Sequence, residues 1–516
     1  MLTRRTEART VRIEAAELAA ARVHPAHPNN GDESSYRDAT GLNFIGNFTK
    51  GLPHDPVGVV DRAAYHTLLR AINAGSPEFF EQVTLGTPLP NRQKLRNPLA
   101  GVAFDLEGLD AQALSMPPAP RLDSAEAAGE MVELYYMALL RDVHFSTFAA
   151  DPGVNAAAAA LMALSDFRGP KPVTPATIFR GFTPGDLTGP YVSQFLLKPV
   201  NFGTIPFNQR QWTDKAGIDF LMIPAQWRAV QNGVVVPVPF PTNPRLYVRN
   251  MRDLATYVHF DALYEAYLNA CLILMNLKAP LDHGNPYLVS QTTDAFGTFG
   301  DPHILSLVCE VATRALKAVW FQKWYVHRRL RPEAFAGLVH HNHFSGTPFP
   351  LHPDVTGSPV LALVQAHNFA QGAPNSYLLP MAFPEGSPMH PAYGAGHATV
   401  AGACVTILKA WFDESAVFDP ASPDPGWRPV VANLPGTALV PAPGAPHMTV
   451  GGELNKLAAN IAIGRNMAGV HWRSDYTESV KLGEQIAIDL LEEQKLCYRE
   501  PASFSLTRFD GSAITI

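Results

Sequence analysis

The sequence predicts a mainly α-helical fold, with two helical bundles in one globule, long proline-rich loops and only minor short β-hairpins. Apolar residues recur at helical spacing in several long segments of the 516-residue chain. The 46 prolines exceed the usual share of about 5% and cluster between those segments. No glycine-rich nucleotide loop follows a strand-like run, and no internal repeat is evident. These observations favour a helical scaffold whose stiff loops shape a pocket.

The first half of the chain is expected to contain more loop than helix. Residues 1–60 are polar and rich in Pro, Gly and Asn, so we expect an extended N-terminal arm with one early helix, at a subunit interface. Residues 61–516 are expected to form one helical domain. Its first half is predicted to contain helices at 61–73, 124–145 (capped by Ser124) and 153–167, and a short hairpin at 234–240.

Helices dominate the second half of the chain. Apolar residues at helical spacing predict them at 251–278, 302–327, 358–370, 395–412, 453–468 and 474–497. Chemistry-bearing residues gather in three segments near the ends of these helices, namely 320–332, 390–397 and 465–475.

The composition excludes several classes of function. The net charge is −6, so no nucleic-acid partner is expected. Four widely spaced cysteines form no Cys-x-x-Cys pair, which argues against a zinc knuckle or a disulfide framework. No long apolar run predicts a membrane span and no signal peptide is visible, so the default location is cytoplasmic. Charged residues are only 17%, which together with the arm favours a homo-oligomer, a dimer or higher.

The stretch Gly394-Ala395-Gly396-His397 predicts an anion-binding site. Two glycines let the backbone approach a ligand, and an apolar helical run begins at once. The free N–H groups and the positive dipole end of that helix favour an anion. His397 would stand at its edge as a proton donor or acceptor, with His390 seven residues earlier.

Two further segments supply cations and a nitrogen ligand. Lys323 and Arg331 lie eight residues apart, with Pro332 ending the helix; the alternative is a solvated basic surface that includes Arg328 and Arg329. Arg465 and His471 flank a glycine, and Asp475 is placed to accept the Nδ1–H of His471; the alternative is a helix C-terminus with cationic capping.

Together these residues would surround a tetrahedral oxyanion. Arginine forks match phosphate-like oxygens, and lysine adds a point charge. The pocket could hold a phosphoryl group, with His471 as nucleophile and His397 as leaving-group acid. It could instead hold a metal oxyanion through a single bond to His471.

The three segments resemble the K…RP, GH and R…H signature of the vanadium-dependent haloperoxidases, which share their site with type-2 phosphatidic acid phosphatases and bacterial acid phosphatases. The segment from Lys323 through RRLRPEAF is similar to the algal and bacterial bromoperoxidase branch. So are residues 133–145, 189–197 and 295–319, so the resemblance covers most of 130–490.

The resemblance implies two four-helix bundles and a vanadate cofactor bonded to His471 Nε2. Lys323, Arg331, the Gly396 N–H and Arg465 would neutralise its oxygens, and His397 would be the acid–base partner. Hydrogen peroxide would oxidise a halide ion (bromide, iodide and, as a further candidate, chloride) to a hypohalous acid, which halogenates a small organic nucleophile. The alternative within the superfamily is a phosphatase with His471 as phospho-acceptor.

Three positions decide how closely the chain follows that family. Ala395 stands where the family usually has serine, which removes one hydroxyl from the oxyanion site. Trp320 is similar to the fungal chloroperoxidases and His390 to the algal enzymes, so the halide pocket is expected to be a hybrid.

Asp294 and Asp301 flank a Gly-rich loop where some relatives hold structural calcium.

Overall fold

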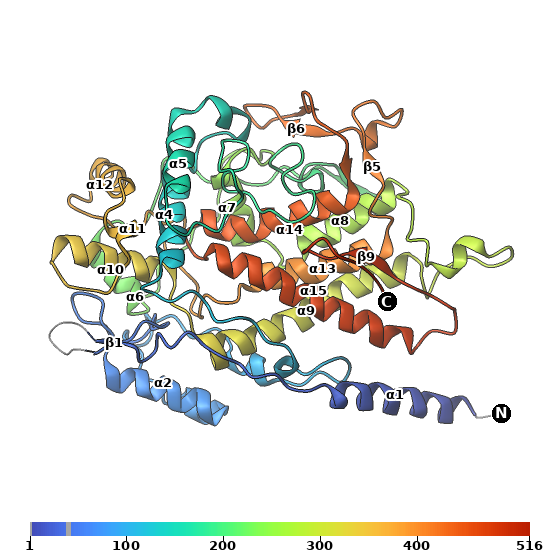
Figure 1. The fold of residues 1–516 in the computed structure, drawn as a ribbon, viewed down its shortest axis with the longest axis horizontal. Helices are drawn as coiled ribbons and strands as arrows, with labels where there is room; N and C mark the ends of the chain where they lie inside the picture. Colours follow the sequence, from blue (N-terminus) through green and yellow to red (C-terminus); the bar gives the residue numbers. More distant parts are fainter. Residues whose placement is uncertain (1–2, 38–42) are drawn as a thin grey trace.

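The computed structural model describes residues 3–37 and 43–516 as a mainly helical molecule (Figure 1). Its α-helices are α1 Arg4–Ala21, α2 Arg62–Ala74, α3 Pro77–Phe80, α4 Ala125–Leu139, α5 Pro152–Met162, α6 Pro224–Gln231, α7 Met251–Phe260, α8 Glu265–Asn276, α9 Asp301–Phe321, α10 Pro332–Phe344, α11 Pro353–Thr356, α12 Val360–Ala370, α13 Gly396–Trp411, α14 Val450–Met467 and α15 Arg473–Lys495. A π-helical segment, η6, continues α9 over Gln322–His327. None of the helices in the described part of the chain is long and apolar enough to cross a membrane.

The remaining regular structure is short. Single 3₁₀ turns lie at η1 Pro98–Val102, η2 Ala111–Ala113, η3 Phe145–Ala150, η4 Gln194–Leu196, η5 Pro286–Val289 and η7 Pro425–Trp427. The strands are β1 Tyr36–Arg37, β2 Asn43–Phe44, β3 Val200–Phe202, β4 Ile205–Phe207, β5 Val417–Phe418, β6 Val430–Ala432, β7 Leu439–Pro441, β8 Met448–Thr449, β9 Ser505–Thr507 and β10 Ala513–Thr515. They pair antiparallel as β1–β2, β3–β4, β5–β8, β6–β7 and β9–β10.

Helix α13 lies at the centre of the main core, packed against α9, α14 and α15 (Figure 1). Glycines allow α13 and α15 to approach at backbone distance. A Cβ on Gly402 would lie 2.1 Å from the Val480 carbonyl oxygen, and one on Gly483 would lie 2.0 Å from that of Thr399. The first turn of α13 is therefore fixed by close packing, which keeps the glycine-rich entry in place.

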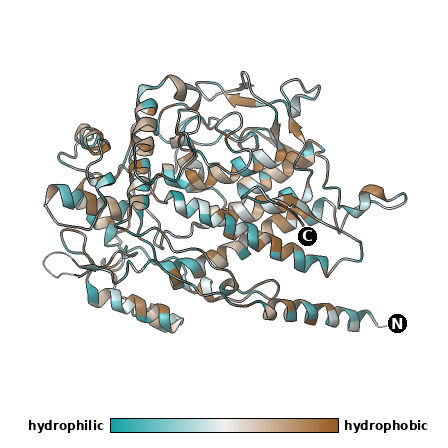
Figure 2. Cartoon of the chain, viewed as in Figure 1, coloured by the Kyte–Doolittle hydropathy of each residue, from teal (hydrophilic) through white to brown (hydrophobic). Residues whose placement is uncertain are grey.

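The N-terminal residues divide into two parts. Residues 44–52 pack into the body, where Phe48 and Leu52 join α2 and Trp324 in a second, smaller core cluster. Helix α1 projects from the body (Figure 1) and buries no residue, although Figure 2 shows hydrophobic residues along it. Its role at a subunit interface stays a prediction.

The periodicity located most helices but not their breaks. The helix expected at 251–278 is two helices, α7 and α8, separated at Asp261. The helix expected at 302–327 changes to a π-helix at Gln322. The hairpin expected at 234–240 is wrong: this segment contains one isolated bridge, from Val234 to Arg92.

Helix α10 was not expected, because Pro332 indicated only the end of a helix. Proline also suits the first turn of the next helix, where its missing N–H has no intrahelical acceptor. The histidines at 340–343 therefore lie on a helix, and His340 and His341 are buried.

Candidate active site

The three sequence segments meet in one buried pocket. Lys323 lies on η6, Arg331 is the N-cap of α10, and Arg465 lies near the end of α14. His390 and His471 come from the loops that precede α13 and α15. All five are buried, so the solvated-surface interpretation of Lys323 and Arg331 is wrong, whereas Arg465 does lie in the last turn of α14, where the capping interpretation placed it.

Arg331 holds the centre of the pocket. Its Nη1 donates to the Val470 carbonyl at 2.6 Å and faces His471 Nε2 at 3.0 Å. Its Nε donates to the His390 carbonyl at 2.9 Å, and its Nη2 lies 3.0 Å from His390 Nδ1. One guanidinium thus orients both imidazoles. Because arginine only donates, His471 Nε2 must be the unprotonated nitrogen.

Three cations gather here without a carboxylate on any of them. Lys323 Nζ donates only to the carbonyls of Pro391 and Ala392, at 2.8 and 3.1 Å. Arg465 Nη1 donates to the Val258 carbonyl at 2.6 Å, while its buried Nε has no partner. None of Lys323, Arg331 and Arg465 makes an ion pair with a carboxylate within the described residues, so their charges remain available to an anion.

The pKa values of Lys323, Arg331 and Arg465 are all lowered in this buried, positively charged pocket. Burial and then Arg465 lower the pKa of Arg331 to about 9, against the opposing charge of Asp475. Burial lowers the pKa of Arg465 to about 10 and, with Arg331, places that of Lys323 well below its usual range. A bound polyanion would oppose all three shifts, because it favours the charged forms.

His471 is held by a chain of charges that extends to α4; we call Glu130, Arg329 and Asp475 the histidine clamp. Asp475 Oδ2 accepts from His471 Nδ1 at 2.7 Å, and its Oδ1 accepts from Arg329 Nη1 at 2.9 Å. Arg329 Nη2 donates to Glu130 Oε2 at 2.6 Å. Burial, then Arg331 and Lys323, holds the pKa of His471 well below its usual range. His471 is therefore neutral, with the Nε2 lone pair directed at the cations.

His397 stands apart from this cluster and pairs with a carboxylate. Its Nε2 lies 3.1 Å from Oδ1 of Asp261, the residue that separates α7 from α8. Burial alone would raise the pKa of Asp261, but His397 and then Arg465 outweigh it and hold the pKa below its usual range. The side chain of His397 is 18% exposed, so it can exchange a proton with solvent.

The glycine-rich entry provides backbone donors and close contacts. Gly396 is the first residue of α13, and N–H groups of a first turn have no intrahelical acceptor. A Cβ on Gly396 would lie 3.1 Å from the Trp320 ring. Ala395 supplies no hydroxyl, but Ser479 of α15 lies beside it and accepts from the Ala395 N–H at 2.8 Å.

Trp320 and His390 form the outer wall of the pocket. Their ring centroids are 4.8 Å apart, and Lys323 Nζ lies 5.6 Å from the tryptophan ring. Trp320 also lines a cavity of about 1000 Å³ that opens outward between residues 92–100 and 235–238. We call this cavity the mouth.

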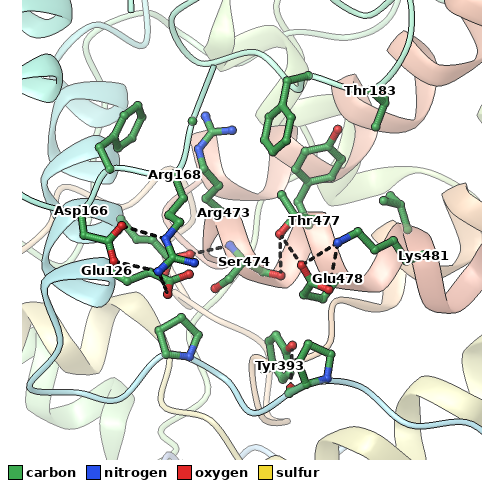
Figure 3. A pocket seen from close by; sticks show the side chains of 18 of the residues that line it. Glu126, Asp166, Arg168, Thr183, Tyr393, Arg473, Ser474, Thr477, Glu478 and Lys481 are labelled. Atoms are coloured by element: carbon green, nitrogen blue, oxygen red, sulfur yellow. Dashed lines mark hydrogen bonds and ion pairs between the residues drawn. The ribbon is translucent and has the colours of Figure 1, made fainter. Parts of the chain in front are cut away.

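A second cavity, of about 850 Å³, lies on the α4 and α15 side of the histidine clamp (Figure 3). Glu130 and Ser474 line it, and the Ser474 N–H donates to Glu130 Oε1 at 2.5 Å. Its other charges are paired, except that of Lys171, which makes no ion pair within the described residues. Figure 3 shows Arg168 with Asp166 and Glu126, and Lys481 with Glu478.

The donor set fits a tetrahedral oxyanion with one metal–nitrogen bond. Three buried cations, an unpartnered Arg465 Nε and the start of α13 favour the anion, and the Nε2 of His471 can bond a metal. Elsewhere, the described residues contain no group of three or more His, Cys, Asp or Glu able to hold a metal. Calcium at Asp294 and Asp301 stays a prediction.

The structure thus brings together Trp320, Lys323, Arg331, His390, Gly396, His397, Arg465, His471 and Asp475 in one region, as the sequence predicted. Sequence reasoning missed three residues. Arg329 appeared only in the alternative of a solvated basic surface, Asp261 lay inside a predicted continuous helix, and Glu130 is one charge on a long helix. Nothing in the sequence marks Glu130, but the i to i+8 spacing of Lys323 and Arg331 could have drawn attention to Arg329 between them.

Comparison with known proteins places this geometry in a family. The family described as VCPO second helical-bundle domain matches residues 307–499. The chain is 42% identical to the vanadium-dependent bromoperoxidase of Corallina officinalis over 98% of this chain and 97% of that one. It is 34% identical to the vanadium-dependent bromoperoxidase of Ascophyllum nodosum over 91% and 86%. The homohexameric structure of the second vanadate-dependent bromoperoxidase from that alga matches with a TM-score of 0.91 at 30% identity, covering 99% of this chain and 90% of that one. The chain therefore belongs to the vanadium-dependent haloperoxidases, in their bromoperoxidase branch, enzymes that oxidise a halide with hydrogen peroxide.

Proposed function

We propose that this pocket holds vanadate and oxidises bromide and iodide, with chloride as a slower substrate. The observation that carries the proposal is the trio of buried cations, unpaired with carboxylates, around the Nε2 of His471. His471 would make the single metal bond. Lys323, Arg331, Arg465 and the Gly396 N–H would hold the oxygens. When bound, vanadate supplies the Lewis acid that activates hydrogen peroxide.

Each of the chain's own groups has a task in this reaction. In the histidine clamp, Asp475 accepts a hydrogen bond from the Nδ1–H of His471, which keeps the proton on Nδ1 and leaves Nε2 free to act as a ligand. Lys323 and the two arginines supply fixed positive charge in a buried site, where it is worth more than in water. His397, paired with Asp261, accepts and returns the proton of peroxide at the exposed side of the pocket.

Trp320 and His390 are proposed to border the halide. Both are close to Lys323, and the pKa of His390 lies well below its usual range because of burial and then Lys323. A neutral wall of this kind places no hydrated cation beside the halide, and we propose that it admits chloride as well as bromide. A halide titration with a dimedone acceptor tests this, and loaded protein that brominates but never chlorinates at any pH contradicts the chloride proposal.

The phosphatase alternative uses the same pocket and is disfavoured, because the curated relatives over nearly the whole chain are bromoperoxidases. We also propose a homo-oligomer, supported by the homohexameric relative and by the projecting α1. Hydrogen peroxide, halide and a small organic nucleophile complete the proposed set of partners.

One experiment tests the central proposal. The protein is loaded with orthovanadate, and its vanadium content is measured beside bromide-dependent bromination and p-nitrophenyl phosphate hydrolysis. We expect one vanadium per chain and bromination in the native protein, and loss of both in His471→Ala. His367→Ala, which removes a half-buried histidine that pairs with Asp219, is the matched control. Phosphate hydrolysis without bromination would overturn the proposal.

A further inference from the structure

The mouth is built from two segments that meet above the active site. Residues 91–93 pair with 233–235, through Val235 N–H to Asn91 at 2.8 Å and Gln93 N–H to Gly233 at 2.7 Å. The cavity between these segments and α9 has a volume of about 1000 Å³, large enough for a drug-sized organic molecule.

The mouth carries unpaired positive charge. Arg92, Lys94 and Arg96 line it, and none of them makes an ion pair within the described part of the chain. The Nε of Arg92 is buried and has no hydrogen-bond partner. Lys317 and Glu385 also line the cavity, but Lys317 is paired with Asp105 and Glu385 with His259. In the second cavity most lining charges are paired, with Lys171 as an exception, whereas the mouth brings three unpaired cations together.

Apolar side chains complete the lining of the mouth. Val235 and Val238 are 50% and 39% exposed, although both are aliphatic. Leu95, Val236 and Leu316 also line the cavity, and Trp320 forms its inner end. Exposed aliphatic residues facing unpaired cations suit a molecule with an apolar body and an anionic head, because each part then meets its own complement.

The mouth is attached directly to the reactive site. Trp320 Nε1 donates to the Arg96 carbonyl at 3.1 Å, and the Arg96 N–H donates to the carbonyl of Met389 at 3.0 Å. Met389 precedes His390, whose ring lies 4.8 Å from that of Trp320. A molecule held in the mouth would therefore have its inner end beside the proposed source of hypohalous acid.

We propose that the mouth binds the organic acceptor and selects aromatic organic anions. Arg92, Lys94 and Arg96 hold the anionic head, and the valine wall and Trp320 hold the apolar body. In the halogenation, ring electrons form the C–Br bond as the O–Br bond of HOBr breaks, and the released hydroxide takes the proton from the same carbon to give water. The role as acceptor site rests on the proposed function, whereas the binding itself does not.

The first test measures binding without vanadate. Calorimetric titration compares 6-hydroxy-2-naphthoate with its neutral amide. In R92Q/K94Q/R96Q we expect the Kd of the acid to rise about tenfold or more and that of the amide to change little. R5Q/R9Q/K215Q, which removes three exposed, unpaired cations elsewhere, should bind both ligands as the native protein does. An unchanged Kd of the acid in the triple mouth variant overturns the proposal, and so does an equal loss for acid and amide.

The triple variant could weaken binding by rearranging the loop at residues 92–96. Val238→Asp controls for this, because it leaves that loop intact and adds a negative charge to the mouth. It should also weaken binding of the acid more than that of the amide, and equal binding of both would count against the proposal.

With vanadate, bromide and peroxide, the native protein should brominate the acid in preference to the amide, and R92Q/K94Q/R96Q should lose that preference. If the native protein oxidises no bromide but still binds the acid selectively, the proposed function fails and the binding site stands. If the protein oxidises bromide while acid and amide bind alike, the inference alone fails.

Discussion

At the residue scale, the histidine clamp explains how one imidazole stays neutral among three cations. Asp475 faces both His471 and Arg329, and Glu130 neutralises the far side of Arg329. Without Glu130, Arg329 would draw charge from Asp475 and weaken its hold on the Nδ1 proton. Removing a group that supports a ligand in this way typically costs about 10–100-fold in metal affinity.

We therefore expect Glu130→Gln to weaken vanadate binding by about tenfold. The amide keeps the shape of the side chain but removes the charge that balances Arg329. The measurement is a vanadate titration followed by calorimetry. Glu126→Gln is the control, since Glu126 lines the same second cavity and pairs only with Arg168. An affinity equal to that of the native protein would show that α4 does not support His471.

Burial of His327 makes the stability of the fold sensitive to acid. Both ring nitrogens are buried and without partners, and burial, then His27 and Arg328, lowers the pKa of His327 to about 3. The unfolded chain binds this proton below about pH 6.5, whereas the folded chain does not. Stability is therefore lost as pH falls from about 6.5 toward 3.

His327→Leu should remove this part of the acid sensitivity. Between pH 6.5 and 5.0 a single such histidine contributes about 2 kcal/mol of lost stability. Urea unfolding at both pH values should show a smaller decrease in the free energy of unfolding for the variant than for the native protein, by roughly that amount. His66→Leu, on the exposed face of α2, provides the comparison. Equal decreases in the variant and the native protein would exclude His327 as the source.

At the element scale, periodicity identified where helices lie, but tertiary contacts decided where they break. The break at Asp261 leaves α7 and α8 both apolar, so no change of pattern marks it, yet it places a carboxylate against His397. The π-helical turn of η6 likewise depends on packing around Lys323. Ser124, in contrast, caps α4 through the Ala127 N–H as predicted, because a cap is a local interaction.

Asp261→Asn tests whether this break serves the reaction. The amide cannot stabilise a charged His397, so we expect kcat for bromide oxidation to fall by about tenfold or more and its pH profile to shift to lower pH. The vanadium content should remain near one per chain, because Asp261 does not touch His471. Glu265→Gln, in the first turn of α8, is the control. A change in kcat without any shift in the pH profile would indicate a purely structural role.

At the scale of the whole molecule, the site joins residues from five elements around α13, and sequence alone could supply only those with local signatures. Gly396 and His397 were visible because glycines precede a helix, and Arg331 because a proline follows it. Glu130 is more than 300 residues from His471 in the chain. Its contribution arises from packing of α4 against the first turn of α15, which no local pattern encodes.

Helix α1 leads to a prediction about assembly. Its Ile13 and Leu18 are 43% and 45% exposed, and it buries no residue. Its contacts with the body include an ion pair from Arg499 to Glu7. Helices in proteins gain most of their stability from packing an apolar face, so we expect α1 to pack against another copy of the chain.

Ile13→Ser/Leu18→Ser, which preserves the length of the chain, should therefore reduce the oligomer to a smaller species in sedimentation velocity. The thermal midpoint of the dissociated chain should stay close to that of the native protein measured at the same subunit concentration, since neither residue belongs to a core cluster. Glu14→Gln/Glu17→Gln alters exposed charges of the same helix and should leave sedimentation unchanged. If the serine variant sediments as the native protein does, α1 lies outside the interface, and the contacts between copies must come from the body instead.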